Sequence, residues 1–378
     1  MLDLQEFPLI DHHCHTLMDG SHKGNLEAFI RMTSEAPATY PLSDLQETVT
    51  YEAVKSIASD ATGRAWEDAA EFKQVFRSLD YADYSRQLFQ SRRYERLFVD
   101  TGFSPAQGMS ADDLATHTNA SIHSILRLET TAQELADSDK PFTVWRDELL
   151  DTVQNARKNG FIGIKSIVAY RTGLELRPAS TAEAQAAYQR WTGSGSVSRP
   201  LMEADLFHYM LWETAPLLIR EELPLQFHSG YGDPDENLLQ GNPLLLREFI
   251  EAFCPRGLRI ALLHTYPYHR EAGYLASVYP GVFFDVSLII PLGASSARRV
   301  VAEALELSPM SRFLFASDAH TRPELFALSA DLFRGALAAY FSDAGVSRHV
   351  AKDKMDRWCR MILHDNASAL YLGESGPG

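Results

Sequence analysis

The chain has 378 residues, of which 45% are apolar, and its 35 basic and 50 acidic side chains give a net charge of −15. This composition excludes a disordered or fibrous protein, and the acidic balance argues against binding to nucleic acid or to an anionic membrane. The chain has only three cysteines, no secretory signal at its N-terminus and no apolar run near the ~20 residues of a membrane span. We therefore expect a cytoplasmic protein.

Short apolar runs alternate with longer amphipathic segments along the chain. The runs predict eight strands, at residues 9–15, 96–100, 121–128, 162–167, 223–228, 259–264, 282–286 and 312–317. Helical periodicity separates the later strands, over residues 143–158, 204–221, 243–253, 270–278, 296–305 and 323–337. Alternating strands and helices indicate a parallel sheet, and eight such units favour closure. The predicted fold is therefore α/β, a (β/α)8 TIM barrel, with residues 1–378 forming a single domain.

Two stretches exceed what a minimal barrel needs. Residues 16–94 follow the first predicted strand and have helical periodicity with little strand character, so we expect a helical cap there. Residues 168–200 follow the fourth predicted strand and are expected to form a loop insertion. Both begin at the carboxyl end of a strand, where insertions shape the substrate pockets of barrel enzymes.

Ligand-type side chains gather at the ends of the predicted strands. His13 and His15 lie in the run Asp-His-His-Cys-His, and they share one strand face because alternate side chains of a strand point the same way. Four more such residues follow: Lys165 ends the fourth predicted strand, His228 the fifth and His264 the sixth, and Asp318 comes directly after the eighth. Since the carboxyl ends of barrel strands meet at one face, we expect these six side chains to form a metal site.

This pattern of His-x-His, Lys, His, His and Asp resembles that of the amidohydrolase superfamily over nearly the whole chain. Three longer strings resemble in particular the amidohydrolase-like domain of nodulin/glutamine-synthetase fusion proteins: GIKSIVAYRTGL at 163–174, LPLQFHSGYGD at 223–233 and LHTYPYHREAGYL at 263–275. No synthetase half accompanies them in this chain, so we expect a free-standing version.

The resemblance implies a role for each ligand-type residue. His13 and His15 would bind one divalent ion, for which we expect zinc, together with Asp318. His228 and His264 would bind a second ion, or one of them would join the first site while the other contacts substrate.

Lys165 decides between one ion and two. A carbamylated Lys165 would be an anion that bridges two ions, whereas an unmodified Lys165 would be a cation that holds a substrate carboxylate beside a single ion. A Lys165 paired with a neighbouring acid is a third interpretation. Asp318, assisted by His264, is the predicted catalytic residue: it would take a proton from a metal-activated water, although a helix N-cap is an alternative role for it.

Four further residues are candidates for substrate contacts: Tyr170, Arg171, Arg127 and Tyr231. Arginine suits bidentate recognition of a carboxylate. Arg127 could instead form an internal ion pair with Glu129, which we expect on the same strand face. We expect a structural role for Asp285, and positions behind the metal ligands or at the surface for His12, His269 and His320.

The expected function is that of a metal-dependent hydrolase, which cleaves a C–N (amide-type) bond of a small carboxylate-bearing substrate with a metal-activated water. A metal-dependent decarboxylase of the same superfamily is one alternative, and a non-catalytic scaffold for a glutamine-synthetase-like partner is another. The expected partner is a small-molecule substrate, with neither nucleic acid nor membrane involved, and assembly as a homo-oligomer is left open.

Overall fold

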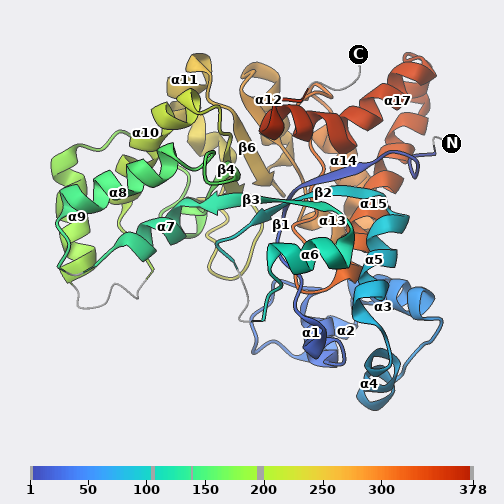
Figure 1. Ribbon diagram of the computed structural model, residues 1–378. Coiled ribbons are helices and arrows are strands. Elements are labelled where there is room, and N and C mark those ends of the chain that lie inside the picture. The colour runs from blue at the N-terminus through green and yellow to red at the C-terminus, as the bar shows by residue number, and fades with distance from the viewer. Residues whose placement is uncertain (1–2, 104–106, 138, 194–199, 375–378) are drawn as a thin grey trace.

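The computed structural model describes residues 3–103, 107–137, 139–193 and 200–374. Its centre is a parallel sheet of seven strands in sequence order (Figure 1). The strands are β1 (Leu9–Cys14), β2 (Tyr94–Asp100), β3 (Ser121–Arg127), β4 (Phe161–Ser166), β5 (Leu225–Ser229), β6 (Ile260–His264) and β7 (Val282–Phe284). Seven of the eight predicted strands are therefore present, with ends that shift by a few residues.

The eighth predicted strand is not a regular strand, so the prediction of eight regular strands is wrong at this position. Its segment nevertheless lies between the two edges of the sheet, because Leu314 donates its amide to Phe284 on β7 at 3.0 Å and Phe315 accepts from His12 on β1 at 3.2 Å. Contacts with distant parts of the chain interrupt the strand, and the Phe315 amide donates to the Ile362 carbonyl at 3.2 Å. The Asp11 carboxylate accepts both the Ser317 amide, at 3.0 Å, and the Ser317 hydroxyl, which removes that amide from a regular ladder.

Helices follow the strands, and those predicted after the third strand are present within a few residues. They are α8 (Phe142–Gln154), α10 (Ala204–Arg220), α11 (Arg247–Phe253) after a 3-10 turn (Pro243–Leu246), α12 (His269–Val278), α14 (Ala297–Ala304) and α15 (Pro323–Ser342). Other helices are α6 (Ala111–Thr118), α7 (Leu128–Leu135), α13 (Ile289–Leu292), α16 (Ala344–Ser347) and α17 (Lys352–Arg360). Among the described residues, no helix combines the length and the apolar character needed to cross a membrane.

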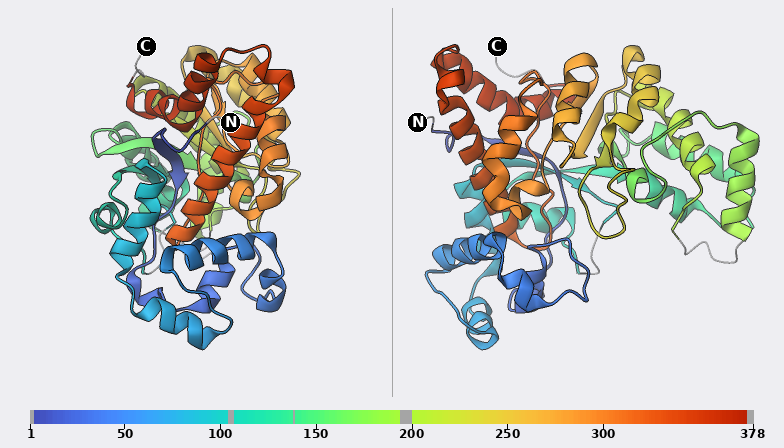
Figure 2. Two further views of the ribbon diagram at one scale, coloured as in Figure 1. Left: turned by 90° about the vertical axis from the view of Figure 1, so that its right-hand side faces the viewer. Right: turned by 180° about the vertical axis from the view of Figure 1, so that it is seen from behind.

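Five helices occupy the long segment between β1 and β2: α1 (Leu26–Arg31), α2 (Leu42–Gln46), α3 (Val49–Thr62), α4 (Ala69–Arg77) and α5 (Tyr81–Ser91). Their starts are encoded locally, because the side chains of Asn25, Thr48, Asp68 and Asp80 each accept a backbone amide of the helix that follows. Helices α1–α4 gather at one end of the molecule in every view (Figure 2).

A buried aromatic cluster anchors this segment to the rest of the fold. The Arg322 guanidinium lies 4.7 Å from the ring centre of Phe76 and 5.1 Å from that of Phe29. Arg322 also donates to Glu324 at 2.7 Å, at the start of α15. The Arg322 cation, which packs over the aromatic rings and is neutralised by Glu324, thus holds the segment between β1 and β2 against α15.

The second predicted insertion, residues 168–200, begins with a 3-10 turn (Val168–Tyr170) and continues into α9 (Thr181–Gly193). Residues 194–199 of this span lie outside the described residues. With α8 and α10, α9 forms the group of helices that projects at the left of Figure 1.

Candidate metal centre

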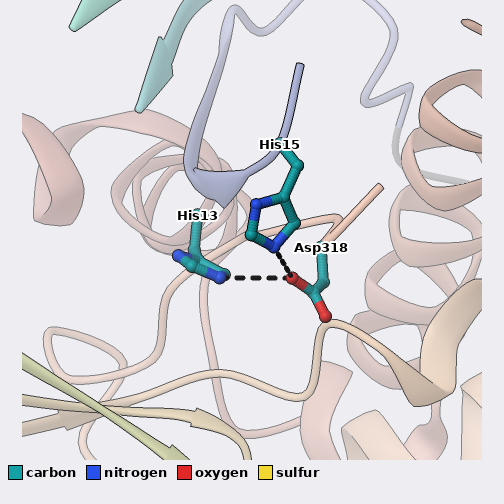
Figure 3. A group of neighbouring side chains, drawn as sticks. All are labelled: His13, His15 and Asp318. Atoms are coloured by element: carbon teal, nitrogen blue, oxygen red, sulfur yellow. Dashed lines mark ion pairs between the residues drawn. The ribbon is translucent and has the colours of Figure 1, made fainter. Parts of the chain in front are cut away.

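Two imidazoles and one carboxylate converge at the carboxyl ends of the strands (Figure 3). Oδ1 of Asp318 lies 3.2 Å from Nε2 of His13 and 3.3 Å from Nε2 of His15. All three residues are buried, and their ligand-type atoms lie within 4.8 Å of one another. Two nitrogens and one carboxylate oxygen that face a common point are a donor set suited to zinc.

The backbone fixes this convergence. His13 lies on β1, and the Asp318 amide donates to the His13 carbonyl at 3.1 Å, so the two residues are held side by side. Asp318 has a φ of +51° and His264 a φ of +68°, a left-handed conformation that residues other than glycine seldom adopt. Such strain is retained where the surrounding structure demands a particular side-chain direction, and here it occurs at two residues of the site.

The hydrogen bonds of Gln226 determine the tautomer of His13. Gln226 donates its amide NH2 to the His12 carbonyl at 3.0 Å and to the Tyr371 hydroxyl at 2.9 Å, which turns Oε1 toward His13. Nδ1 of His13 lies 3.1 Å from that oxygen and must donate to it. The lone pair therefore resides on Nε2, which faces Asp318. An acceptor that orients the ring in this way is typical of metal-binding histidines.

Protonation also favours metal binding at this cluster. Burial, with a smaller contribution from the charge of Lys165, lowers the pKa of His13 to about 3, so its imidazole is neutral at pH 7. Oδ1 of Asp318 is buried and has no hydrogen-bond partner of good geometry among the described residues. A buried carboxylate oxygen without a donor is costly, and a divalent cation would remove that cost. The residues present thus fit a divalent ion.

The other predicted ligands lie beside this cluster. Nζ of Lys165 lies 3.0 Å from Nε2 of His13, and Nδ1 of His264 lies 3.5 Å from Oδ2 of Asp318. The His228 ring is 4.5 Å from the His264 ring between centres, and its Nε2 is buried without a partner. The structure therefore brings all six sequence-predicted ligand residues together.

A pocket of about 210 Å³ opens onto these side chains. Three of the predicted substrate-contacting residues line it: Arg127, Tyr170 and Arg171. Tyr231 does not. It lines a neighbouring shallow pocket, and its own amide donates to the Tyr266 carbonyl at 2.6 Å.

The predicted Arg127–Glu129 ion pair is wrong. The strand ends at Arg127, and Glu129 belongs to α7, where it accepts the Ser166 hydroxyl at 2.6 Å. Arg127 instead donates to the buried Asp100 carboxylate, at 2.5 Å from Nη2 and 3.1 Å from Nε. Burial alone would raise the pKa of Asp100, but the charges of Arg127 and Lys165 outweigh burial and hold that pKa below its usual value.

The remaining titratable residues singled out in the sequence occupy three different places. Nε2 of His12 lies 2.8 Å from Asp285, and the same carboxylate accepts the His264 amide at 2.8 Å. His269 pairs with Glu303 at 2.8 Å, away from the cluster. His320 lines the pocket.

Three residues of the site are not among those that the sequence predicts: Asp100, Gln226 and Glu35. Asp100 ends an apolar strand as Lys165 and His264 do, so the same pattern could have found it. Gln226 is an uncharged residue inside β5, and Glu35 lies between α1 and α2, far from any strand. Neither carries a local signal that separates it from ordinary polar residues.

Comparison with known proteins bears on the family of the chain. A family model described as amidohydrolase matches residues 160–372, more than half of the chain. A protein of Lactobacillus casei ATCC 334 has been assigned by inference as a metal-dependent hydrolase. It is 38% identical to this chain, with a TM-score of 0.92 over 98% of this chain and 96% of that chain.

Two other likenesses are more limited. Protein fluG of Emericella nidulans is 28% identical over 409 aligned residues, which take in 99% of this chain and 47% of fluG, so the chain spans about half the length of this curated relative. Uronate isomerase of Thermotoga maritima is 12% identical, with a TM-score of 0.68 over 97% of this chain and 95% of that chain, a likeness that shows the fold alone. The family-model match and the full-length likeness to the Lactobacillus casei protein confirm the superfamily resemblance seen in the sequence: the chain belongs to the amidohydrolase family.

Proposed function

We propose that the protein is a zinc-dependent hydrolase that cleaves a C–N (amide-type) bond of a small carboxylate-bearing substrate. Family membership supports hydrolase chemistry with a divalent metal. The observation that carries the proposal is the convergence of His13, His15 and Asp318 on one point, with the His13 tautomer fixed by Gln226. Two nitrogens and one oxygen, with no thiolate, are donors that zinc accepts.

A divalent ion bound at this point would polarise the scissile carbonyl and lower the pKa of the attacking water. Asp318 can then serve through both of its oxygens. Oδ1 faces His13 and His15, while Oδ2 lies 3.5 Å from Nδ1 of His264. We assign to Oδ2 the task of holding the proton that the water loses and passing it to the leaving nitrogen. His264 is kept in place for this by Ser287, whose hydroxyl is 2.8 Å from Nδ1.

We further propose that Lys165 carries a carbamate and bridges two ions, the second of which His228 and His264 would hold. Carbamylation requires a neutral amine, and burial lowers the pKa of Lys165. The competing arrangement is a cationic Lys165 beside a single ion. The Asp100 carboxylate, 3.8 Å from Nζ, favours that arrangement, and with it a decarboxylase is the second candidate function.

Arg171 is the proposed anchor for the substrate carboxylate. It lines the pocket, and its Nε is buried without a hydrogen-bond partner among the described residues. Arg127 also lines the pocket, but its guanidinium is already engaged by Asp100. We propose that residues 16–94 act as the cap of this pocket, because Glu35 from that segment is part of its wall.

The test is a hydrolysis screen of small N-acyl amino acids and of side-chain amides of amino acids, all of which carry a free carboxylate. The protein is stripped with a chelator and then assayed with and without added zinc, and both amine release and carbon dioxide are measured. We expect zinc-dependent amine release that falls at least ~100-fold in the Asp318→Asn variant, as expected when a general base is lost. Amine release by metal-free protein would contradict the proposal, and carbon dioxide without amine would establish the decarboxylase instead.

A further inference from the structure

The pocket wall carries charged groups of both signs, and most of them are compensated by a neighbour. Arg127 is paired with Asp100. Lys165 lies 3.8 Å from the same carboxylate. Asp233, in the loop after β5, is acted on by the negative charge of Asp235, another residue of the wall, and to a smaller extent by the positive charge of Arg171. Arg127, Lys165 and Asp233 therefore each have a charge of opposite sign acting on them.

Glu35 has no charge of opposite sign acting on it. It lies between α1 and α2 and lines the pocket together with His15, Lys165 and Asp318. The charged groups that act on it are Asp318 and Asp233, both of which are acids, and these charges add to burial in raising its pKa to about 7. Among the described residues, no cation pairs with the Glu35 carboxyl group and no donor is hydrogen-bonded to it. A partly buried carboxyl group in such surroundings is unfavourable unless something else supplies a positive charge.

The position of Glu35 is built into the fold. The Ser34 hydroxyl accepts the Ala36 amide at 3.0 Å, and Glu35 lines the neighbouring shallow pocket together with Tyr231. The Tyr231 amide is held in turn by the Tyr266 carbonyl at 2.6 Å. Tyr231, predicted as a substrate contact, therefore lies beside Glu35 but outside the wall of the pocket at the metal site.

A second uncompensated carboxyl group lies on the same side. The Glu236 side chain is 3% exposed, and neither of its oxygens has a hydrogen-bond partner among the described residues. Its Oε2 lies 4.0 Å from Nε2 of His228, a pocket-lining ring whose nitrogen is also unpartnered. Glu236, from a different segment of the chain than Glu35, thus adds negative charge behind the pocket wall.

We propose that Glu35 selects a substrate that carries a cationic nitrogen in addition to its carboxylate, so that the substrate class is small zwitterionic amides of amino-acid type. This inference rests on the proposed function, since it refines the substrate of the same site. The carboxylate of the substrate pairs with Arg171, and its ammonium group pairs with Glu35. A substrate with a carboxylate alone would leave the Glu35 carboxyl group without a partner, whereas the ammonium would pair with it directly.

Binding of product-like ligands tests this without hydrolysis. Calorimetric titration of the zinc-supplemented full chain would compare matched pairs: β-alanine with propionate, 4-aminobutyrate with butyrate, and 6-aminohexanoate with hexanoate. Within at least one pair, we expect the amino compound to bind at least tenfold more tightly. Equal binding within every pair, tighter binding of the plain carboxylates, or no detectable binding of any amino compound would overturn the proposal.

Variants identify the residue responsible. Glu35→Gln should abolish the preference, and Glu35→Asp should retain part of it, because aspartate keeps the charge. Glu47→Gln is the matched control: it makes the same change in the same segment, at an exposed residue outside the pocket wall, and should keep the preference. The assignment would be overturned if the Glu35→Gln variant kept the preference. It would also be overturned if that variant lost affinity equally for both members of a pair.

The two proposals can fail separately. If the amino compounds are preferred but no amide is hydrolysed, the hydrolase function is wrong and the selection by Glu35 stands as a binding property. If amides are hydrolysed with no preference for a cationic group, the function stands and the selection is wrong.

Discussion

Gln226 offers a sharp test of how this site prepares its ligands, because it touches His13 without being a ligand itself. Replacing it with leucine removes the acceptor 3.1 Å from Nδ1 of His13, and Nε2 is then no longer obliged to carry the lone pair. Loss of a partner that orients a ligating histidine typically weakens metal binding 10- to 100-fold, or ~1.4–2.7 kcal/mol. Three hydrogen bonds disappear at once, which should lower the free energy of unfolding by about 3 kcal/mol.

Zinc affinity would be measured by competition with a chromophoric chelator, and stability by urea unfolding of the metal-free protein. Tyr371→Phe is the matched control, because it removes the hydroxyl that accepts from Gln226 at 2.9 Å but leaves the His12 carbonyl to orient the amide. We expect Tyr371→Phe to reduce stability and to keep the zinc affinity. An unchanged zinc affinity in folded Gln226→Leu, or an equal loss in Tyr371→Phe, would refute the reasoning.

Three further predictions concern charges in the pocket. Arg127→Met should lower the free energy of unfolding by about 3 kcal/mol, because buried Asp100 keeps only Lys165, at 3.8 Å, as a cation. Arg171→Met should change stability by less than ~1 kcal/mol and raise KM for a carboxylate-bearing substrate at least tenfold; equal destabilisation in urea would contradict this contrast. The Glu35 pKa of about 7 lies above its ordinary 4.5, so its contribution to stability is present below pH 4.5 and is lost as the pH rises through 7. Between pH 4.5 and 8, metal-free Glu35→Gln should therefore gain ~1–2 kcal/mol on the wild type, allowing for partial exposure, and a pH-independent difference would count against the environment assigned to Glu35.

The sequence is sufficient to predict where a residue lies when one local pattern determines its position. Residues that end apolar runs in a parallel sheet must meet at one edge, so the sequence alone places Lys165, His228 and His264 together. The helix starts after β1 are similarly legible, because capping residues such as Thr48 and Asp68 act on the backbone within three residues.

The sequence is insufficient where two residues that contact each other lie far apart along the chain. The sequence pattern pairs Arg127 with the nearby Glu129, whereas the carboxylate that accepts its hydrogen bonds belongs to Asp100 on the neighbouring strand. The apolar residues of the eighth run predict a strand, but the side chain of Asp11 takes the Ser317 amide. Both outcomes depend on which side chains of adjacent strands lie opposite one another, and the pattern within a single strand does not contain that information.

The central claim is that His13, His15 and Asp318 hold a divalent metal. The most direct measurement is elemental analysis of protein purified without chelator, joined to anomalous diffraction at the zinc edge. We expect bound zinc, with its anomalous peak within coordination distance of Nε2 of His13, Nε2 of His15 and a carboxylate oxygen of Asp318, and loss of the metal in the His13→Ala, His15→Ala double variant. A peak elsewhere in the chain, or unchanged metal content in the double variant, would contradict the account.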